Sequence, residues 1–137
     1  MRGAIAFEGR QRQPNAGRET PLHACKQEAL LMMGACDKAL QAAYHRNHIP
    51  TEKQHQPWID DCAAQVINAL AAVDAMIDAD SPYLLLGRLT QADITAFIAE
   101  RLARAGQLRI DTDTQMPRLR ALTRRLIRYR AFSSTEP

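Results

Sequence analysis

Valine and aromatic residues are scarce in this sequence of 137 residues. Valine occurs only as Val66 and Val73, and aromatic residues make up 5% of the chain. Alanine, by contrast, occurs 23 times and leucine 14 times. Because β-branched and aromatic residues favour strands whereas alanine and leucine favour helices, this composition argues against a sheet. We therefore expect an all-α protein.

Long apolar runs and secretory features are also lacking. No stretch approaches the roughly 18 to 20 consecutive apolar residues of a membrane-spanning helix. Residues 1–18 include Glu8 and no apolar run of signal-peptide length. The three cysteines, an odd number without a CxxC pair, are more typical of small buried residues than of a disulfide framework. We expect a single cytoplasmic domain with no membrane partner.

The charge of the chain is unevenly distributed, although its net value is only +3. Residues 101–130 hold nine arginines against two aspartates. Such a segment could bind phosphate groups, or it could be the solvated face of a last helix, with arginine stems covering apolar surface. Tyr129 is its only aromatic residue, and it has no zinc-finger or helix-turn-helix signature. We favour the solvated face and expect no nucleic-acid partner.

Signals for helix starts and stops divide the chain. Residues 1–19 show no sustained apolar period and predict a loose N-terminal arm. Thr20-Pro21 predicts the start of a helix that runs to about residue 46. Pro57 opens a second long helix, which should end near Ala79. Two long helices joined by a short break should pack antiparallel.

Apolar residues recur at intervals of three and four in both long helices, which predicts the faces that they bury. In the first helix these are Leu22, Cys25, Ala29, Met32 or Met33, Cys36, Leu40 and Ala43, and in the second Trp58, Cys62, Val66, Leu70, Val73 and Ile77.

The strongest local signal is Thr90-Gln91-Ala92-Asp93, which predicts a capping box at the start of a third helix. Asp93 takes the acceptor role that Glu commonly fills. Leu89 before the cap and Ile94 inside the helix are placed for a hydrophobic staple. Gly106 predicts the end of this helix. The preceding apolar run, residues 83–89, fits a buried strand and an ordered loop equally well.

The C-terminal part predicts a polar connector over residues 111–116 and a last helix that begins at Pro117. Its arginines should face outward, and residues 134–137 form a tail. The inward positions of this helix are Leu119, Leu122, Leu126 and Tyr129.

Three histidines, His45, His48 and His55, lie close together in the sequence. They could bind zinc or nickel, or they could be solvated residues at a helix C-terminus, where a positive imidazole suits the helix dipole. We favour the second interpretation and expect no metal site.

Residues 20–133 resemble the C-terminal helical domain of the bacterial glutathione S-transferases. The most specific match is the segment from Tyr83 to Phe97, YLLLGRLTQADITAF. In that family the apolar run is an ordered loop, and the Thr and Asp cap the central helix. Two weaker matches are residues 52–59, similar to the opening of the family's fifth helix, and residues 116–132, similar to its last helix.

The resemblance implies an all-α helical bundle with two long antiparallel helices, a capped central helix and a last Arg-rich helix. Family members carry a thioredoxin-like domain before this one, which binds glutathione and supplies the residue that holds the thiolate. Because this sequence shows no such βαβ pattern, we expect no catalytic residue and no cofactor in the chain. It should conjugate glutathione to electrophiles only when a glutathione-binding domain is supplied.

The resemblance also indicates candidate partners and pocket residues. In the family this domain lines part of the pocket for a small apolar electrophile and part of the dimer interface. Met33, Asp37 and Tyr44 share one face of the first helix, and we take them as candidate pocket residues, although simple packing explains such spacing as well. We expect a homodimer or pairing with a thioredoxin-like domain. The alternative is a non-catalytic helical module for protein interaction or dimerisation.

Overall fold

The computed structural model describes residues 20–105, 108 and 110–135, and the described part contains helices and no strand. The predicted all-α fold is therefore confirmed. The arm expected for residues 1–19 lies outside the described residues, as does Gly106. The elements are α1 (Pro21–His48), the 3-10 turn η1 (Thr51–Lys53), α2 (Gln56–Met76), α3 (Gln91–Arg104), α4 (Thr112–Gln115), α5 (Pro117–Leu126) and α6 (Arg130–Ser133).

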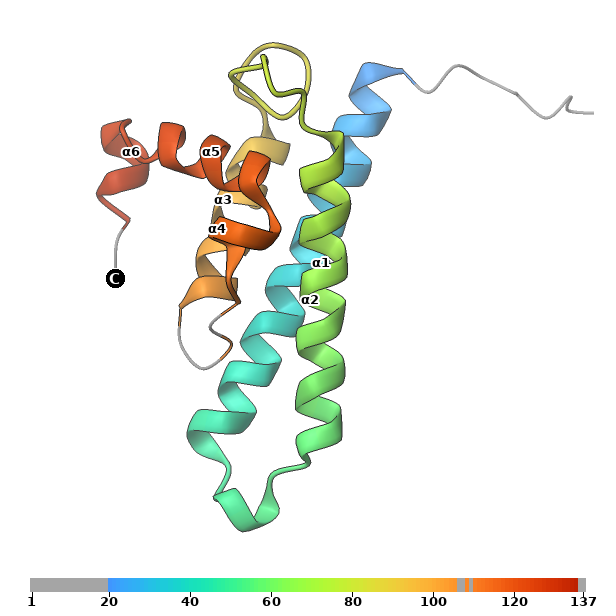
Figure 1. Cartoon of the computed structure of the whole chain (residues 1–137), viewed down its shortest axis with the longest axis vertical. Helices are drawn as coiled ribbons and strands as arrows, with labels where there is room; N and C mark the ends of the chain where they lie inside the picture. Colours follow the sequence, from blue (N-terminus) through green and yellow to red (C-terminus); the bar gives the residue numbers. More distant parts are fainter. Residues whose placement is uncertain (1–19, 106–107, 109, 136–137) are drawn as a thin grey trace, which may run out of the picture.

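The helices α1 and α2 form the predicted antiparallel hairpin, joined through η1 (Figure 1). Thr20 caps α1, because its hydroxyl oxygen accepts a hydrogen bond from the backbone N–H of His23 at 3.3 Å. A proline lies in the first turn of each helix, where the missing N–H costs no hydrogen bond. The closed end of the hairpin extends beyond the other helices (Figure 1).

The face that α1 buries is made mostly of small residues, with Met32 as the large apolar one. Leu22 and Leu40, predicted to point inward, are exposed instead. Because α1 packs against both α2 and α3, small side chains let it lie close to both helices, and the larger leucines are left on the outside. The buried apolar residues of α1 are Cys25, Ala29, Met32, Ala35, Ala39 and Ala42.

One main core joins α1, α2, α3 and α5, and a small second core closes the far end of the hairpin. Trp58, predicted inside, is 36% exposed, and its ring lies 5.1 Å from that of His45. The adjacent Ile59 fills the second core in its place. The fully buried large apolar residues are Met32, Ile59, Leu70, Met116, Leu119, Leu122, Leu126, Val66 and Val73.

The apolar run 83–89 is an ordered loop rather than a strand, as the family resemblance implies. Leu86 and Gly87 have φ angles of 58° and 61°, so the backbone turns in the left-handed region and cannot continue as an extended strand. Leu84 reaches the main core from this loop. The loop crosses one end of the bundle and delivers the chain to α3 (Figure 1).

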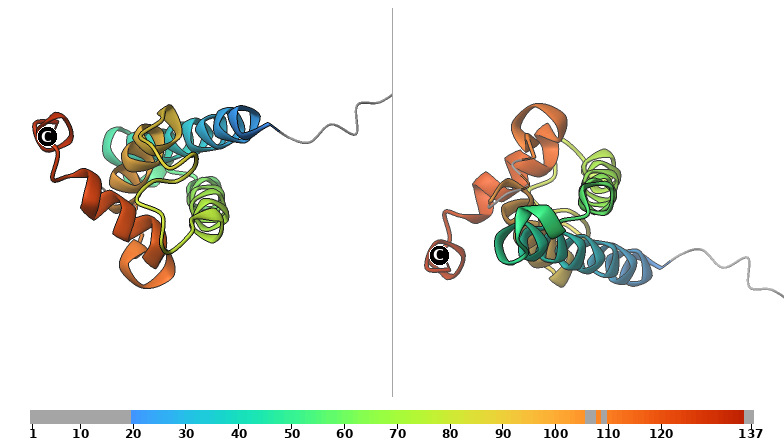
Figure 2. Two further views of the ribbon diagram at one scale, coloured as in Figure 1. Left: turned by 90° about the horizontal axis from the view of Figure 1, so that it is seen from above. Right: turned by 90° about the horizontal axis from the view of Figure 1, so that it is seen from below.

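The C-terminal part is less regular than the sequence predicts. The connector contains the short helix α4, in which Asp111 accepts a hydrogen bond from the N–H of Thr114 at 3.2 Å. The expected last helix is divided, because α5 ends at Leu126 and the chain turns before α6. Tyr129, predicted to point inward, lies in this turn and is exposed. Figure 2 shows α6 at the outer edge of the bundle.

Candidate functional site

A line of exposed residues runs along the outer face of α1, which we call the α1 stripe. Intervals of three and four residues place its members on one side of the helix. Leu30 and Met33 are 66% and 58% exposed. Large apolar side chains gathered on one surface are typical of a binding site. The α1 stripe consists of Leu22, Lys26, Leu30, Met33, Asp37, Leu40 and Tyr44.

A cavity of about 630 Å³ lies at the N-terminal end of the α1 stripe. Its size is in the range of small-molecule sites. The charged residues of its lining are Lys26 and Arg88, so it suits an apolar molecule with a negative group. It is lined by Leu22, Cys25, Lys26, Ala29 and Leu30 from α1, and by Leu86, Arg88, Leu89, Thr90 and Gln91 from the loop and the start of α3.

A second cavity, of about 350 Å³, lies at the other end of the α1 stripe, between Leu40, Tyr44 and Trp58. Two pairs of tilted rings lie here: the ring centroids of Tyr44 and His48 are 4.6 Å apart, and those of His45 and Trp58 are 5.1 Å apart. His45 and His48, two of the histidines that the sequence raised as metal ligands, take part in these ring contacts. Among the described residues, no group of three or more His, Cys, Asp or Glu could hold a metal ion.

The structure places Met33, Asp37 and Tyr44 together on the exposed α1 stripe. Tyr44 lines the second cavity, and the carboxylate of Asp37 accepts a hydrogen bond from the side chain of Gln41 at 2.6 Å. Met33 lies on the stripe between the two cavities. The three residues therefore share one accessible face, and their contact with a substrate remains a prediction.

Asp93 is buried inside the protein and is not part of the lining of either cavity. Its carboxylate accepts hydrogen bonds from the backbone N–H and the hydroxyl of Thr90, at 2.8 and 2.7 Å, and from the N–H of Leu84 at 2.7 Å. This one side chain thus joins the 83–89 loop to the start of α3, where the capping box forms. Leu89 is exposed and Ile94 is partly buried against the main core, so the staple remains a prediction.

None of the three cysteines is in a disulfide. Burial raises the pKa of the Cys36 and Cys62 thiols, which disfavours the thiolate form that a nucleophile needs. Cys25 is buried and lines the first cavity.

The described helices give no sign of a membrane span, since none combines the necessary length and apolar character.

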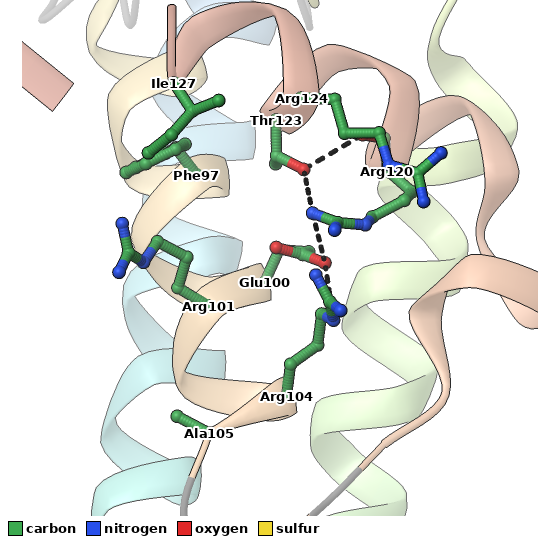
Figure 3. Close-up of a pocket in the computed structure, with 9 residues that line it drawn as sticks. All are labelled: Phe97, Glu100, Arg101, Arg104, Ala105, Arg120, Thr123, Arg124 and Ile127. Atoms are coloured by element: carbon green, nitrogen blue, oxygen red, sulfur yellow. Dashed lines mark hydrogen bonds and ion pairs between the residues drawn. The ribbon is translucent and has the colours of Figure 1, made fainter. Parts of the chain in front are cut away.

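Sequence reasoning missed Glu100, which is completely buried between α3 and α5 (Figure 3). Its carboxylate lies 3.7 Å from the guanidinium groups of both Arg104 and Arg120. The spacing of Glu100 and Arg104, four apart on one helix, was the signal available in the sequence. Burial of the pair depends on α5, which the spacing does not reveal.

Two arginines of α5 hold neighbouring segments in place, beyond forming the predicted solvated face. Arg118 donates a hydrogen bond to the carbonyl oxygen of Ile77 at 3.2 Å. Arg125 donates to the carbonyl oxygen of Ser81 at 3.1 Å. Both contacts fix the segment that leaves α2.

A third buried carboxylate, Glu28, lies on the inner face of α1. Burial raises its pKa, so the folded protein holds the proton more tightly than the unfolded chain. Its contribution to stability is therefore present at acidic pH and is lost as the pH rises through the pKa of the folded state. Glu28→Gln should be more stable than the wild type by about 1 kcal/mol at pH 7 and equally stable near pH 4. Urea unfolding at both pH values measures this difference.

The exposed Glu52→Gln is the control for this prediction, because removal of a solvated charge should leave the stability nearly unchanged at either pH. A Glu28→Gln variant that is less stable than the wild type at pH 7 would show that the buried carboxylate has a favourable partner.

A family model and a solved structure are similar to this chain. The family model described as "Glutathione S-transferase, C-terminal domain" matches residues 56–125, half of the chain. A solved glutathione S-transferase from Methylobacterium radiotolerans, in complex with glutathione sulfonate, superposes with a TM-score of 0.75 at 20% identity. The match covers 93% of this chain and 57% of that one, so this chain spans little more than half of that structure's length. No curated protein sequence matches significantly.

Proposed function

Since the chain belongs to the glutathione S-transferase family through its C-terminal domain, we propose that it is the electrophile-binding and dimerising half of a glutathione-conjugating enzyme. In this proposal a thioredoxin-like domain supplies the glutathione site. Glutathione is then a co-substrate that reaches the electrophile across the surface of this chain. The same proposal places the protein in the cytoplasm, which agrees with its three unpaired cysteines.

The observation that carries the proposal is the α1 stripe. Its apolar side chains are exposed in the isolated chain, although burial of one such side chain is worth roughly 1.5–3 kcal/mol. The cavity of about 630 Å³ beside Leu22 and Leu30 is wide enough for a small apolar electrophile. A thioredoxin-like domain docked on α1 would cover part of the stripe. The residues that line the cavity would then form one wall of the cleft between the two domains.

Titration of glutathione into the purified chain, with a conjugation assay in parallel, tests whether the glutathione site lies on a separate domain. We expect neither glutathione binding nor turnover by the chain alone. Addition of a glutathione-binding thioredoxin-like domain should give turnover of a chloronitrobenzene electrophile. Micromolar glutathione binding by the chain alone would show that its helices build a glutathione site themselves, and the proposal would be wrong.

The α1 stripe also predicts self-association. Met33→Glu places a charge in the middle of the stripe and should shift the chain to monomers, with at least a tenfold weaker association constant. Sedimentation velocity over a range of concentrations measures the change. A wild type that is entirely monomeric at high concentration would count against the proposed dimer.

Met76→Glu is the matched control for this experiment. It makes the same substitution at a methionine that is 46% exposed on α2, outside the stripe. It should leave self-association unchanged. An equal effect of the two variants would indicate a general influence of net charge instead of an interface on α1.

The same exposed face favours a second candidate, a non-catalytic module for protein interaction or dimerisation. Self-association is expected under both candidates, so it does not separate them. Turnover with an added glutathione-binding domain does, because the interaction module would bind its partner and conjugate nothing.

A further inference from the structure

A third cavity, of about 360 Å³, lies between α3 and α5 and is independent of the α1 stripe. Its lining has a polar part and an apolar part (Figure 3). The polar part consists of Glu100, Arg101, Arg104, Arg120 and Arg124, with Thr123 beside them, and the apolar part of Phe97, Ala105 and Ile127.

Positive charge dominates the polar part. Arg104, Arg120 and Arg124 share two carboxylates, Glu100 and Asp113. Asp113 lies 3.4, 3.1 and 2.6 Å from the three guanidinium groups. Three guanidinium groups against two carboxylates leave this network suited to a further anion. A carboxylate is the partner whose geometry a guanidinium group matches best.

Glu100 contributes the second observation. Its Oε1 atom accepts a hydrogen bond from the hydroxyl of Thr112 at 2.5 Å and faces Arg104 and Arg120. Its Oε2 atom is buried and has no hydrogen-bond partner among the described residues. A buried carboxylate oxygen without a donor is unfavourable. The cavity therefore suits a ligand that carries a negative charge and also an N–H or O–H group that can donate a hydrogen bond to Glu100.

We propose that this cavity binds a small organic carboxylate that carries a hydroxyl or amide N–H beside its carboxylate, together with a short apolar group. The ligand carboxylate would pair with the guanidinium groups at the rim, Arg104 and Arg124. The adjacent donor would meet Glu100 Oε2. The apolar group would lie against Phe97 and Ile127.

Two probes that differ by one hydroxyl group test the proposal. Mandelate has a hydroxyl beside its carboxylate, and phenylacetate is the same molecule without it. In calorimetric titrations of the full chain at pH 7 and low salt, one enantiomer of mandelate should bind at least about tenfold more tightly than phenylacetate. Absence of binding by both probes, or equal affinity for both, overturns the proposal.

Two arginine variants locate the bound carboxylate. Arg124→Met removes a rim guanidinium whose side chain is 63% exposed, so the variant should fold, and mandelate affinity should fall by about tenfold. Arg128→Met makes the same change at an exposed arginine outside the cavity lining and should leave the affinity unchanged. Equal losses in both variants would show non-specific attraction to a basic surface and overturn the site.

Glu100→Gln tests the role of the carboxylate oxygen. The amide oxygen is a weaker acceptor than a carboxylate, so the preference for mandelate over phenylacetate should fall several-fold while phenylacetate binding persists. An undiminished preference would show that another group meets the hydroxyl. If this variant does not fold, the comparison of the two probes on the wild type still decides the proposal. Because the cavity shares no residue with the α1 stripe, its failure would leave the proposed function untouched.

Discussion

Asp93→Ala is expected to destabilise the protein by about 3 kcal/mol. Asp93 is completely buried and accepts three hydrogen bonds, from two groups of Thr90 and from the backbone of Leu84. Alanine leaves these donors without an acceptor, and each unsatisfied buried group costs about 1–3 kcal/mol. The loss should lower the Tm by about 10 °C, measurable by circular dichroism and by urea unfolding.

Two further variants provide reference values for the stability loss of Asp93→Ala. Thr90→Val retains the shape of the side chain but removes the hydroxyl, which donates to the Asp93 carboxylate and caps the backbone N–H of Asp93, and it should cost about 1–2 kcal/mol. Asp61→Ala removes an exposed aspartate from α2 and should change the stability by less than about 0.5 kcal/mol. If Asp93→Ala were as stable as Asp61→Ala, the carboxylate would not hold the 83–89 loop against α3.

Arg120→Met is expected to destabilise the protein by about 3 kcal/mol at pH 7. Arg120 is a charged partner of Glu100, and its Nε atom also donates to Asp113 at 3.1 Å. Removal of one partner from a buried ion pair leaves an uncompensated charge, which costs about 3–5 kcal/mol. We expect the lower end of this range because Arg104 still lies 3.7 Å from Glu100.

A double-mutant cycle separates this ion pair from ordinary packing. With Glu100 already changed to glutamine, Arg120→Met should cost at least about 1 kcal/mol less than in the wild type, because no buried charge is left behind. Arg124→Met is the control, since this exposed ion pair should contribute no more than about 1 kcal/mol. Equal costs of Arg120→Met in both backgrounds would contradict a coupling between Arg120 and Glu100.

The dependence of stability on pH under acidic conditions gives a second test of the ion pairs that Arg120 forms. The hydrogen bond from Arg120, with the nearby charges of Arg120, Arg104 and Arg124, holds the pKa of Asp113 below its usual value of 3.8. A lowered pKa stabilises the folded protein above the pKa of the unfolded state, and this stability is lost as the pH falls through the pKa of the folded state. Below about pH 4 the stability of Arg120→Met should therefore fall less steeply than that of the wild type.

Local sequence signals predicted the helix starts well because their causes are local. Thr20-Pro21 and Thr90 to Asp93 each place a hydrogen-bond acceptor or a pre-set φ angle at the first turn, and both helices begin there. The end of α5 was missed. Residues 127–136 contain no glycine or proline, and the chain turns where α6 brings Phe132 edge-on against Phe97, with the ring centres 4.9 Å apart.

The buried face of α1 shows the limit of periodicity. Alanine and leucine both count as apolar, so the helix carries two stripes with similar spacing. The prediction mixed them, taking Leu22 and Leu40 as buried together with Cys25 and Ala29. The close approach of α2 and α3 selects the small residues, and this choice depends on the distance between helices, which a pattern within one helix does not contain.

Composition, prolines and a capping box specify the helical class, the antiparallel hairpin and the capped start of α3, because these signals act within a few residues. Motifs in the sequence also indicated the family to which the chain belongs. The exposed face of α1 and the burial of Glu100 among arginines of α3 and α5 depend instead on how the helices pack. Burial and ion pairing join residues that are distant in the chain, and they arise only when the helices pack.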